Sequence, residues 1–479
     1  MLFNSLEFII FFPIVVALYF ALNPKYRWIL LLIASYYFYM CWNYKYIILI
    51  AASTIIDYIA GICIYHTRKK YLKTLFLLTS LMTNLGLLFF FKYFNFFGDS
   101  FNYVFEKFNI FYRVPAYHFL LPVGISFYTF QTLSYTIDIY KEGHKPEYHF
   151  GKFALFVSFF PQLVAGPIER STNLLPQFHK NFTFDYNRIK SGIVQMCWGF
   201  FKKVVIADRL AEYVNAVYNN ASDYQGLPLI IATVFFAFQI YCDFSGYSDI
   251  AIGSAKILGY DLMQNFRRPY LAVNIQDFWR RWHISLSTWF RDYVYIPLGG
   301  SRVKKLRWHF NLFITFLISG LWHGAEWTFI IWGGLHGFFL VFANITKKIR
   351  ERINKILGLS GVPGLYKVWQ ITITFILVLF GWIFFRANNT ADAFLIIKNL
   401  LVFKGSSPVN LFRVPSDFTV SIALLGLLIF IEILEERIRL YEKLTRLNRP
   451  VKWAILTVLI LAIFILGMWE AQDFLYFQF

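Results

Sequence analysis

Long apolar segments recur along the whole chain, and they restrict its possible folds more than any other feature. The blocks from Trp28 to Cys41 and from Ala454 to Met468 are two examples. Of the 479 residues, 58% are hydrophobic and 15% are charged. Soluble domains are about 45–50% apolar and about 25% charged. Apolar segments repeated in this way predict membrane-spanning helices rather than one large soluble core.

The apolar segments predict an all-α polytopic membrane protein. A spanning helix needs about 20 residues, and several segments are too short, or too interrupted by Gly and Pro, to cross alone. We therefore expect about 11 transmembrane helices, with the remaining segments re-entrant or interfacial. The segments are 6–22, 28–45, 46–65, 73–95, 117–139, 150–166, 188–207, 227–258, 309–322, 326–345, 367–387, 417–436 and 452–470.

The basic residues indicate how the chain is oriented in a membrane. The formal net charge is +19, and many Lys and Arg lie between apolar segments. Membrane topology and the anionic inner leaflet account for this charge without a nucleic-acid partner. If the early spans alternate, the loops that contain Lys25 and Lys69 share the cytoplasmic side. Both termini are then expected outside the cytoplasm, and the first span, which has no cleavage signal, is expected to be retained.

The region from Asp243 to Trp308 differs from the rest, because it is polar, basic and aromatic together. Within it, residues 275–293 predict a single helix that lies at the interface or inside the protein. Its apolar stripe consists of Phe278, Trp282, Leu286 and Trp289. The basic residues of the region either bind the phosphates of a cytoplasmic donor or hold the segment against anionic lipid. They are Arg267, Arg268, Arg280, Arg281, Arg291, Arg302, Lys304, Lys305 and Arg307.

His323 is the first candidate for a catalytic role. It lies between two apolar segments, in the sequence Gly320-Leu321-Trp322-His323-Gly324. Charged side chains at membrane depth are unfavourable by about 2.5–3.5 kcal/mol, and they usually face a cavity and serve function. An imidazole can remove a proton from a hydroxyl group and then protonate a leaving group. The alternative is a packed histidine bonded to a carbonyl group, and the residue type does not decide between the two.

His283 and the start of the region at Asp243 supply further candidates. His283 follows Trp279 by four residues, so the two side chains would share one face of a helix. By itself, a surface histidine on an amphipathic helix is the simpler interpretation. Asp243 and Ser245 lie inside the apolar segment 227–258 and need polar partners. A structural network and a direct part in catalysis are both open.

No metal site is predicted. The potential ligands show neither a CxxC pair nor a recognised ligand spacing. They are the cysteines Cys41, Cys63, Cys197 and Cys242 and the group His283, His323, Glu326 and His336.

Several motifs resemble the membrane-bound O-acyltransferase (MBOAT) family, and within it the bacterial alginate O-acetyltransferase branch. The motifs are Asp277–Gly300, which begins DFWRRWHISLSTWFR, together with Gly320–Gly324 and Phe244–Asp249. Three further segments fit the same branch: Leu2–Ser5, Phe11–Pro13 and Leu121–Tyr128. The motifs are long and unusual, and the resemblance covers nearly the full length of the chain.

The resemblance implies a single membrane domain, 1–479, with helices around a central funnel and a reactive histidine at its neck. We expect N-terminal helices in 1–115, a catalytic core in 116–345, and C-terminal helices with an aromatic tail in 346–479. The family implies acetyl-CoA as a donor substrate that arrives from the cytoplasm, with no tightly bound cofactor. It also implies a bacterial inner-membrane location, a polysaccharide acceptor and an extracytoplasmic SGNH-type partner.

The resemblance also assigns roles to residues. His323 matches the principal catalytic histidine of the family, and His283 matches its second histidine. The residues that we expect to contact substrates are Asp243, Ser245, Trp279, Arg280, Arg281, Trp282, Ser285, Arg291, Trp322 and Trp327.

The end of the chain carries one more similarity. Residues Phe474–Phe479 resemble the C-terminal motif of the small membrane peptide that accompanies the D-alanyl transferase of teichoic-acid modification. This similarity implies that Tyr476 accepts the acyl group briefly, after activation by His323. The alternative is an aromatic anchor at the membrane interface.

The sequence therefore predicts an O-acetyltransferase that passes an acetyl group across the membrane to an extracytoplasmic polysaccharide. Two alternatives stay open. One is the transfer of D-alanyl or another acyl group to a cell-envelope polymer. The other is a transporter of an acyl donor or lipid that performs no chemistry, because broken helices with polar residues at membrane depth suit that class as well.

Overall fold

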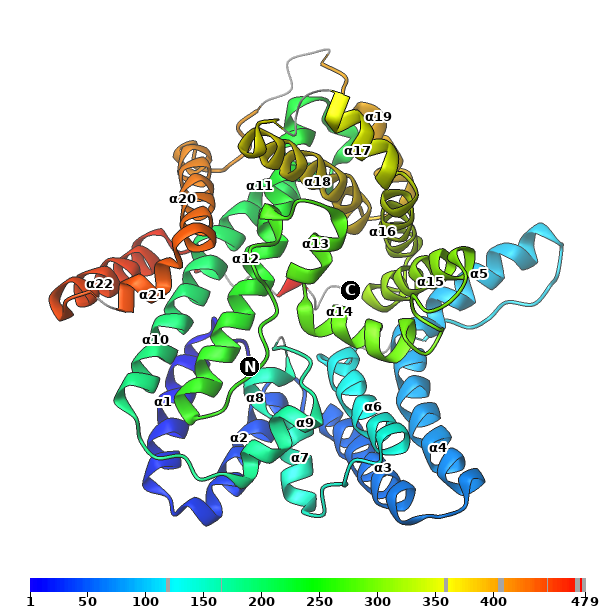
Figure 1. Cartoon of the computed structure of the whole chain (residues 1–479), viewed down its shortest axis with the longest axis vertical. Coiled ribbons are helices and arrows are strands. Elements are labelled where there is room, and N and C mark those ends of the chain that lie inside the picture. Colours follow the sequence, from blue (N-terminus) through cyan, green and yellow to red (C-terminus); the bar gives the residue numbers. More distant parts are fainter. Residues whose placement is uncertain are drawn as a thin grey trace. The chain divides into compact units, whose positions relative to one another are not determined.

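The fold is described by a computed structural model of the chain. It covers residues 1–117, 121–164, 166–356, 361–403, 409–445, 447–469 and 474–475. Over these ranges the chain forms α-helices with short 3-10 and π-helical segments, and it contains no strand (Figure 1). The prediction of an all-α fold is therefore confirmed.

The chain divides into two compact units, and the first consists of Met1–Met196 and Tyr247–Met263. Its helices are α1 (Leu6–Ala21), η1 (Pro24–Tyr26), α2 (Arg27–Met40), η2 (Tyr44–Tyr46), α3 (Ile47–His66), α4 (Lys70–Leu88), η3 (Phe89–Tyr93), α5 (Phe94–Lys107), α6 (Ile125–Glu142), α7 (Phe150–Ser158), α8 (Phe160–Leu163), α9 (Ser171–Leu174), η4 (Leu175–His179) and most of α10 (Tyr186–Phe200).

The second unit consists of Cys197–Gly246 and Gln264–Phe479. Its helices are η5 (Phe201–Ala207), α11 (Asp208–Tyr218), η6 (Ala221–Asp223), most of α12 (Leu227–Leu258), η7 (Pro269–Leu271), α13 (Ile275–Arg281), α14 (Ile284–Phe290), η8 (Arg291–Tyr295), α15 (Lys305–His323), α16 (Trp327–Ile345), α17 (Lys347–Ile356), α18 (Pro363–Arg386), α19 (Thr390–Asn399), α20 (Ser416–Ile438), α21 (Leu440–Thr445) and α22 (Arg449–Leu466).

Seven helical segments among the described residues are long and apolar enough to cross a membrane. They are Tyr44–His66, Lys70–Lys107, Leu227–Leu258, Trp327–Ile345, Pro363–Arg386, Ser416–Ile438 and Arg449–Leu466. This is fewer than we predicted, because some predicted spans form shorter helices. Segment 28–45 yields α2, with 14 residues, and segment 150–166 is divided at Phe159 between α7 and α8.

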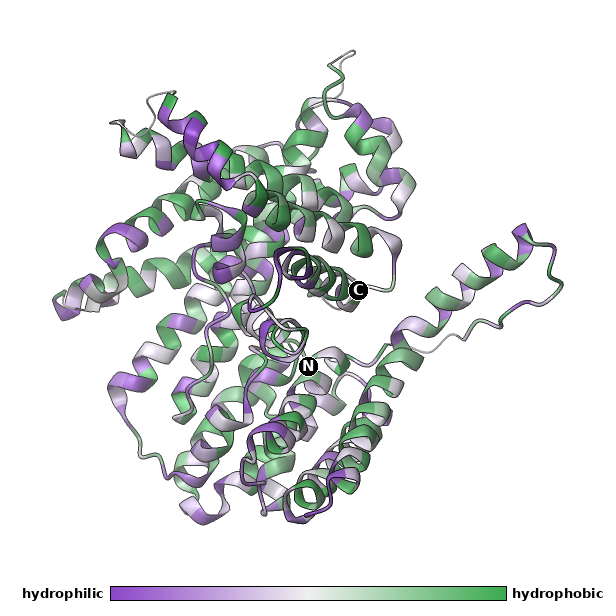
Figure 2. Cartoon of the chain, turned by 45° about the vertical axis from the view of Figure 1, so that its right-hand side comes forward, coloured by the Kyte–Doolittle hydropathy of each residue, from purple (hydrophilic) through white to green (hydrophobic). Residues whose placement is uncertain are grey.

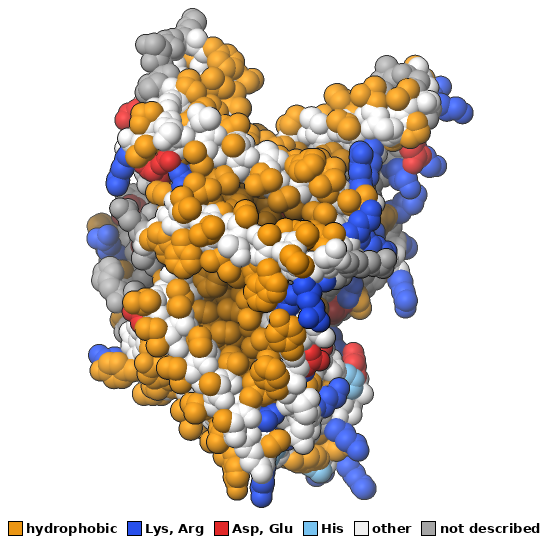
Figure 3. Space-filling view, turned by 90° about the vertical axis from the view of Figure 1, so that its left-hand side faces the viewer, with side chains coloured by type: hydrophobic (Ala, Val, Ile, Leu, Met, Phe, Trp, Pro, Cys, Tyr) orange, Lys and Arg blue, Asp and Glu red, His pale blue; other side chains and the backbone are white. Residues whose placement is uncertain are grey.

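The outer surfaces of the apolar helices match a lipid environment. Hydrophobic residues colour most of the length of these helices in Figure 2, and hydrophobic side chains predominate on the face shown in Figure 3. In α22, for example, Phe464 and Ile465 are 67% and 75% exposed. An exposed apolar surface of this extent is stable against lipid chains but not against water. The chain is therefore a multi-pass membrane protein.

A buried carboxylate joins three helices of the first unit. Asp57 of α3 is fully buried, and its Oδ1 and Oδ2 accept hydrogen bonds from Asn84 Nδ2 of α4 at 3.0 and 2.9 Å. Ser80 of α4 also donates to Asp57 and lies 3.1 Å from the hydroxyl group of Thr136 in α6. In Figure 1 these three helices lie side by side. A satisfied polar network of this kind fixes how the helices pack.

We expect Asp57→Ala to lower the free energy of unfolding by about 3 kcal/mol, because the donors of Asn84 and Ser80 would be left buried without an acceptor. Thermal denaturation of the purified protein in detergent measures the change. Asp99→Ala, which removes an exposed carboxylate from α5, is the matched control. Equal melting temperatures for the two variants would contradict a structural role for Asp57.

Candidate active site

His323 is the last residue of α15 and lies in the interior of the second unit. It is 3% exposed, and Gly324 continues in an extended conformation. The centre of its ring lies 4.9 Å from the ring centres of Trp322 and Trp332 and 5.4 Å from that of Phe385. The imidazole is therefore enclosed by aromatic rings from α15, α16 and α18, which exclude bulk water from it.

Three glycines set the position of His323. A Cβ atom on Gly320 would lie 2.3 Å from the carbonyl oxygen of Phe329, and one on Gly333 would lie 2.4 Å from that of Phe316. A Cβ atom on Gly324 would lie even closer to its neighbour, 2.1 Å from ring carbons of Phe329. No side chain fits at these distances, so α15 and α16 touch backbone to backbone just before the histidine. Gly320 lies against Gly333, and Gly324 lies against the ring of Phe329.

His283 lies at a break between two helices, and this corrects our prediction of one helix over 275–293. Helix α13 ends at Arg281, His283 adopts a left-handed conformation with φ 41° and ψ 57°, and α14 begins at Ile284. The segment before α13 forms hydrogen bonds with the backbone at this break: Arg267 N donates to Arg281 O, and Ile284 N donates to Asn265 O, both at 2.9 Å. These bonds replace the helical ones.

The break separates Trp279 from His283, so the shared helical face that we predicted for them does not form. Trp279 Nε1 donates to His336 Nδ1 at 3.3 Å. The His283 ring instead packs edge-on against Phe244, with ring centres 4.5 Å apart, and lies 6.3 Å from Trp322. Because Trp322 also contacts His323, the two candidate histidines pack against the same indole ring.

His283 is a buried residue and not the surface histidine that an amphipathic helix would present. The side chain is fully buried. Burial lowers the pKa of His283 to about 3, so the ring is neutral at physiological pH. A left-handed conformation of a non-glycine residue costs about 1–3 kcal/mol and persists where its surroundings fix it, often at functional sites.

We expect His283→Asn to keep the melting temperature close to that of the wild type, because Asn tolerates the left-handed conformation. The same change should lower acyl transfer by about tenfold to a hundredfold, because it removes the imidazole that packs beside Trp322. His283→Val is the comparison, since a β-branched side chain is strained in this conformation and should lower the melting temperature as well. Normal transfer by the Asn variant would exclude a role for the imidazole.

A buried charge network lies beside these aromatic residues. Lys203 Nζ is 2.6 Å from Asp243 Oδ1 and 2.8 Å from Asp208 Oδ1, and all three side chains are buried. Lys202 Nζ donates to Ser245 Oγ at 2.9 Å. A Cβ atom on Gly246 would lie 2.8 Å from the carbonyl oxygen of Gly199, so α12 passes close enough for these contacts.

Sequence reasoning placed Asp243 and Ser245 in the site and missed their partners in the π-helical segment η5. A signal was present, because Lys202 and Lys203 lie inside the apolar segment 188–207, where charges need a partner.

The described part of the C-terminal tail folds back against this network. Leu475 N donates to Asp243 Oδ2 at 2.8 Å. Phe474 is fully buried, and its ring lies 5.7 Å from that of Phe244, the residue that supports His283. Figure 1 shows this end of the chain, in red, beside α12. The tail therefore docks in the interior of the second unit, while Tyr476 lies outside the described residues.

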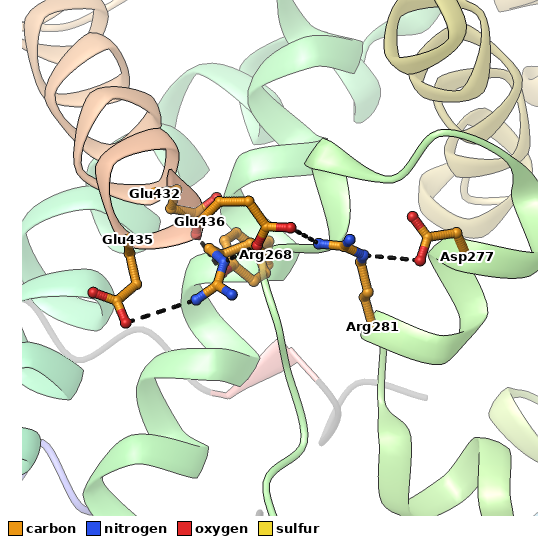
Figure 4. A network of polar contacts seen from close by, with 7 residues as sticks. Arg268, Asp277, Arg281, Glu432, Glu435 and Glu436 are labelled. Atoms are coloured by element: carbon orange, nitrogen blue, oxygen red, sulfur yellow. Dashed lines mark hydrogen bonds and ion pairs between the residues drawn. The ribbon is translucent and has the colours of Figure 1, made fainter. Parts of the chain in front are cut away.

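The arginines predicted to contact substrates have different environments. Arg281 contacts Asp277 at 3.0 Å and Glu436 at 3.1 Å, and Arg268 contacts Glu436 at 2.6 Å (Figure 4). This network ties α13 to the end of α20 and balances the charge of both arginines. Arg280 is exposed, and the exposed Arg291 pairs with Asp292 at 2.7 Å.

The remaining predicted residues are divided between the interior and the surface. Trp279, Trp282 and Trp322 are buried, whereas Trp327 is 55% exposed. Ser285 Oγ donates to Asn265 Oδ1 at 2.6 Å and so supports the turn at His283. Among the described residues, no group of three His, Cys, Asp or Glu side chains is placed to hold a metal ion.

Known proteins share this sequence over most of its length. Residues 141–356, which include both histidines, match the membrane-bound O-acyltransferase family. The peptidoglycan O-acetyltransferase of Helicobacter pylori is 38% identical over 454 residues, covering 87% of this chain and 83% of that relative. The probable alginate O-acetylase of Pseudomonas aeruginosa is 40% identical over 409 residues, covering 84% of this chain and 75% of that relative.

A more distant relative is the teichoic acid D-alanyltransferase of Streptococcus thermophilus, which is 29% identical over 289 residues, covering 55% of this chain and 68% of that relative. The two relatives of higher identity match over most of this chain, and the family resemblance seen in the sequence motifs is confirmed. This chain belongs to the membrane-bound O-acyltransferase family and is an acyltransferase.

Proposed function

We propose that this chain takes an acetyl group from acetyl-CoA on the cytoplasmic side and passes it on for O-acetylation of an extracytoplasmic polysaccharide. The observation that carries the proposal is the similarity, over most of the chain, to a peptidoglycan O-acetyltransferase and to a probable alginate O-acetylase. The environment of His323, buried among aromatic rings next to His283, supports it.

In the proposed reaction, His323 is the general base. A ring nitrogen takes the proton of a hydroxyl group, and the oxygen attacks the thioester carbonyl carbon. The carbon–sulfur bond breaks, and the imidazolium returns the proton to the thiolate of CoA. Because His323 is 3% exposed, both substrates need a path between the rings that surround it.

The contacts of Phe474 and Leu475 support an acyl relay in this reaction. Phe474 lies against Phe244, and Leu475 donates a hydrogen bond to Asp243. In our proposal the phenol of Tyr476 takes the acetyl group first and then passes it to the polysaccharide. An extracytoplasmic SGNH-type partner would complete the transfer. The protein would lie in the bacterial inner membrane with both termini outside the cytoplasm.

Transfer of a D-alanyl group is the second candidate, and the teichoic acid D-alanyltransferase relative favours it. Its identity is lower, and it covers 55% of this chain, against 87% for the peptidoglycan relative. We therefore propose acetyl as the transferred group.

Incubation of the purified protein with acetyl-labelled CoA tests the proposal. Release of free CoA thiol together with labelled protein or labelled polysaccharide is the expected result. Release of thiol only when a D-alanyl carrier protein replaces acetyl-CoA would favour the second candidate. Uptake of labelled donor into proteoliposomes with an intact thioester would instead identify a transporter.

A further inference from the structure

The first unit contains a cavity that the proposed acyl transfer does not use. Its volume is about 370 Å³, within the range of small-molecule sites. The turn between α1 and α2, the start of α7, residues 178–181 and Tyr260 line it. Four cations are among the lining residues, and no carboxylate is: they are Lys25, Arg27, Lys152 and Lys180.

One carboxylate lies near the wall of this cavity, and it is already paired. Glu147 is 2.7 Å from His179 Nε2, and Nδ1 of the same ring is 2.9 Å from Lys152 Nζ. The backbone N–H of His149 also donates to Glu147, at 2.8 Å. Since the lining holds four Lys and Arg side chains and no carboxylate, it has an excess of positive charge.

One cation of the cavity is held by several contacts, and two others are exposed. The Arg27 guanidinium donates to the carbonyl oxygens of Phe182 and Leu22 and lies 4.8 Å from the centre of the Tyr19 ring. These contacts hold its position, whereas Lys25 and Lys180 are exposed at the rim. Helix α2 begins at Arg27 without a side-chain cap, so the positive end of its dipole adds to the charge.

We propose that this cavity binds the phosphate group of an anionic ligand at the membrane surface. Clustered Lys and Arg are the residues that bind phosphate. The cavity lies where the apolar helices α1 and α2 meet, and Tyr26 and Trp28 in its lining are typical of the membrane–water interface. Two sources carry this chemistry, the headgroup of an anionic phospholipid and a soluble phosphate.

Two arms of one experiment separate these sources. In the first, the full chain is purified with a mixture of phosphatidylglycerol and phosphatidylcholine, and native mass spectrometry measures the lipid that it retains. In the second, inorganic pyrophosphate is titrated onto lipid-depleted protein by calorimetry. The test variant is Lys25→Gln/Lys180→Gln, which changes two exposed residues of the cavity. The control is Lys69→Gln/Lys70→Gln, which removes the same charge from two exposed residues at the start of α4.

We expect the wild type and the control to bind the phosphate ligand, and the cavity variant to bind it about tenfold or more weakly. Loss of phosphatidylglycerol retention alone identifies a lipid headgroup, and loss of pyrophosphate binding alone identifies a soluble phosphate. The proposal is overturned if the wild type neither prefers phosphatidylglycerol nor binds pyrophosphate, or if the cavity variant binds like the control. Neither arm measures acyl transfer, so a negative result for phosphate binding does not bear on the proposed acetyltransferase activity.

Discussion

Replacement of His323 by Ala is expected to reduce acyl transfer by at least about 10²- to 10⁴-fold, the usual contribution of a general base. The imidazole is the titratable group at the end of α15, and aromatic rings enclose it. Removing it leaves a cavity among these rings. The variant should therefore still insert in the membrane, with a modest loss of thermal stability. Release of CoA thiol from acetyl-CoA by purified protein measures the change.

The control is His309→Ala, because His309 lies in the same helix and packs against Trp308. This variant should keep wild-type transfer. Activity that survives in the His323 variant at the control level would remove the histidine from the mechanism. A loss of expression in both variants would show that the substitutions destabilise α15. The variant His323→Gln would then be used in place of His323→Ala.

Leu475→Pro is expected to detach the C-terminal tail. Proline has no backbone N–H, so Asp243 would lose the donor that now lies 2.8 Å away in a buried position. An acceptor left buried without its partner costs about 1–3 kcal/mol, which corresponds to about a tenfold to hundredfold larger undocked population. Digestion by carboxypeptidase should remove the tail of this variant faster by that factor, and acyl transfer should fall if Tyr476 is the relay.

Leu475→Ala provides the comparison for the tail, because it shortens the side chain and keeps the N–H group. Its tail should stay close to wild-type resistance. Asp243→Ala removes the acceptor of the same hydrogen bond, and it should also increase the rate of digestion. If the Pro and Ala variants at position 475 are digested at the same rate, the backbone hydrogen bond does not hold the tail.

Most of the helices could be predicted, because the apolar signal is local. The segment 227–258 coincides with α12, and 326–345 differs from α16 by one residue at its start. The prediction failed where distant backbone competes with the helix. Nothing within 275–293 indicates the break at His283, since the bonds that cause it come from Asn265 and Arg267, outside that segment.

The candidate site was predictable by residue type but not by arrangement. Motifs identified both histidines, yet the contact that unites them runs through Trp322, whose ring orientation depends on packing. The partner of Asp243 could not be predicted either, because Lys203 lies 40 positions earlier in the sequence. The two residues meet where Gly246 of α12 lies close to the backbone of Gly199 and Lys203. The sequence predicts that a buried carboxylate needs a positively charged or hydrogen-bonding partner, but it does not predict which residue that partner is.

The contact between Gly320 and Gly333 has a consequence for how lipid acts on the enzyme. A Cβ atom on either glycine would lie 3.0 Å from the Cα atom of the other, so the two helices have no side-chain layer between them that could yield. Helices α15 and α16 should tilt as one body when the bilayer becomes thinner or thicker. Bilayer thickness would then change the depth at which the imidazole sits, while its position relative to Trp332 stays the same.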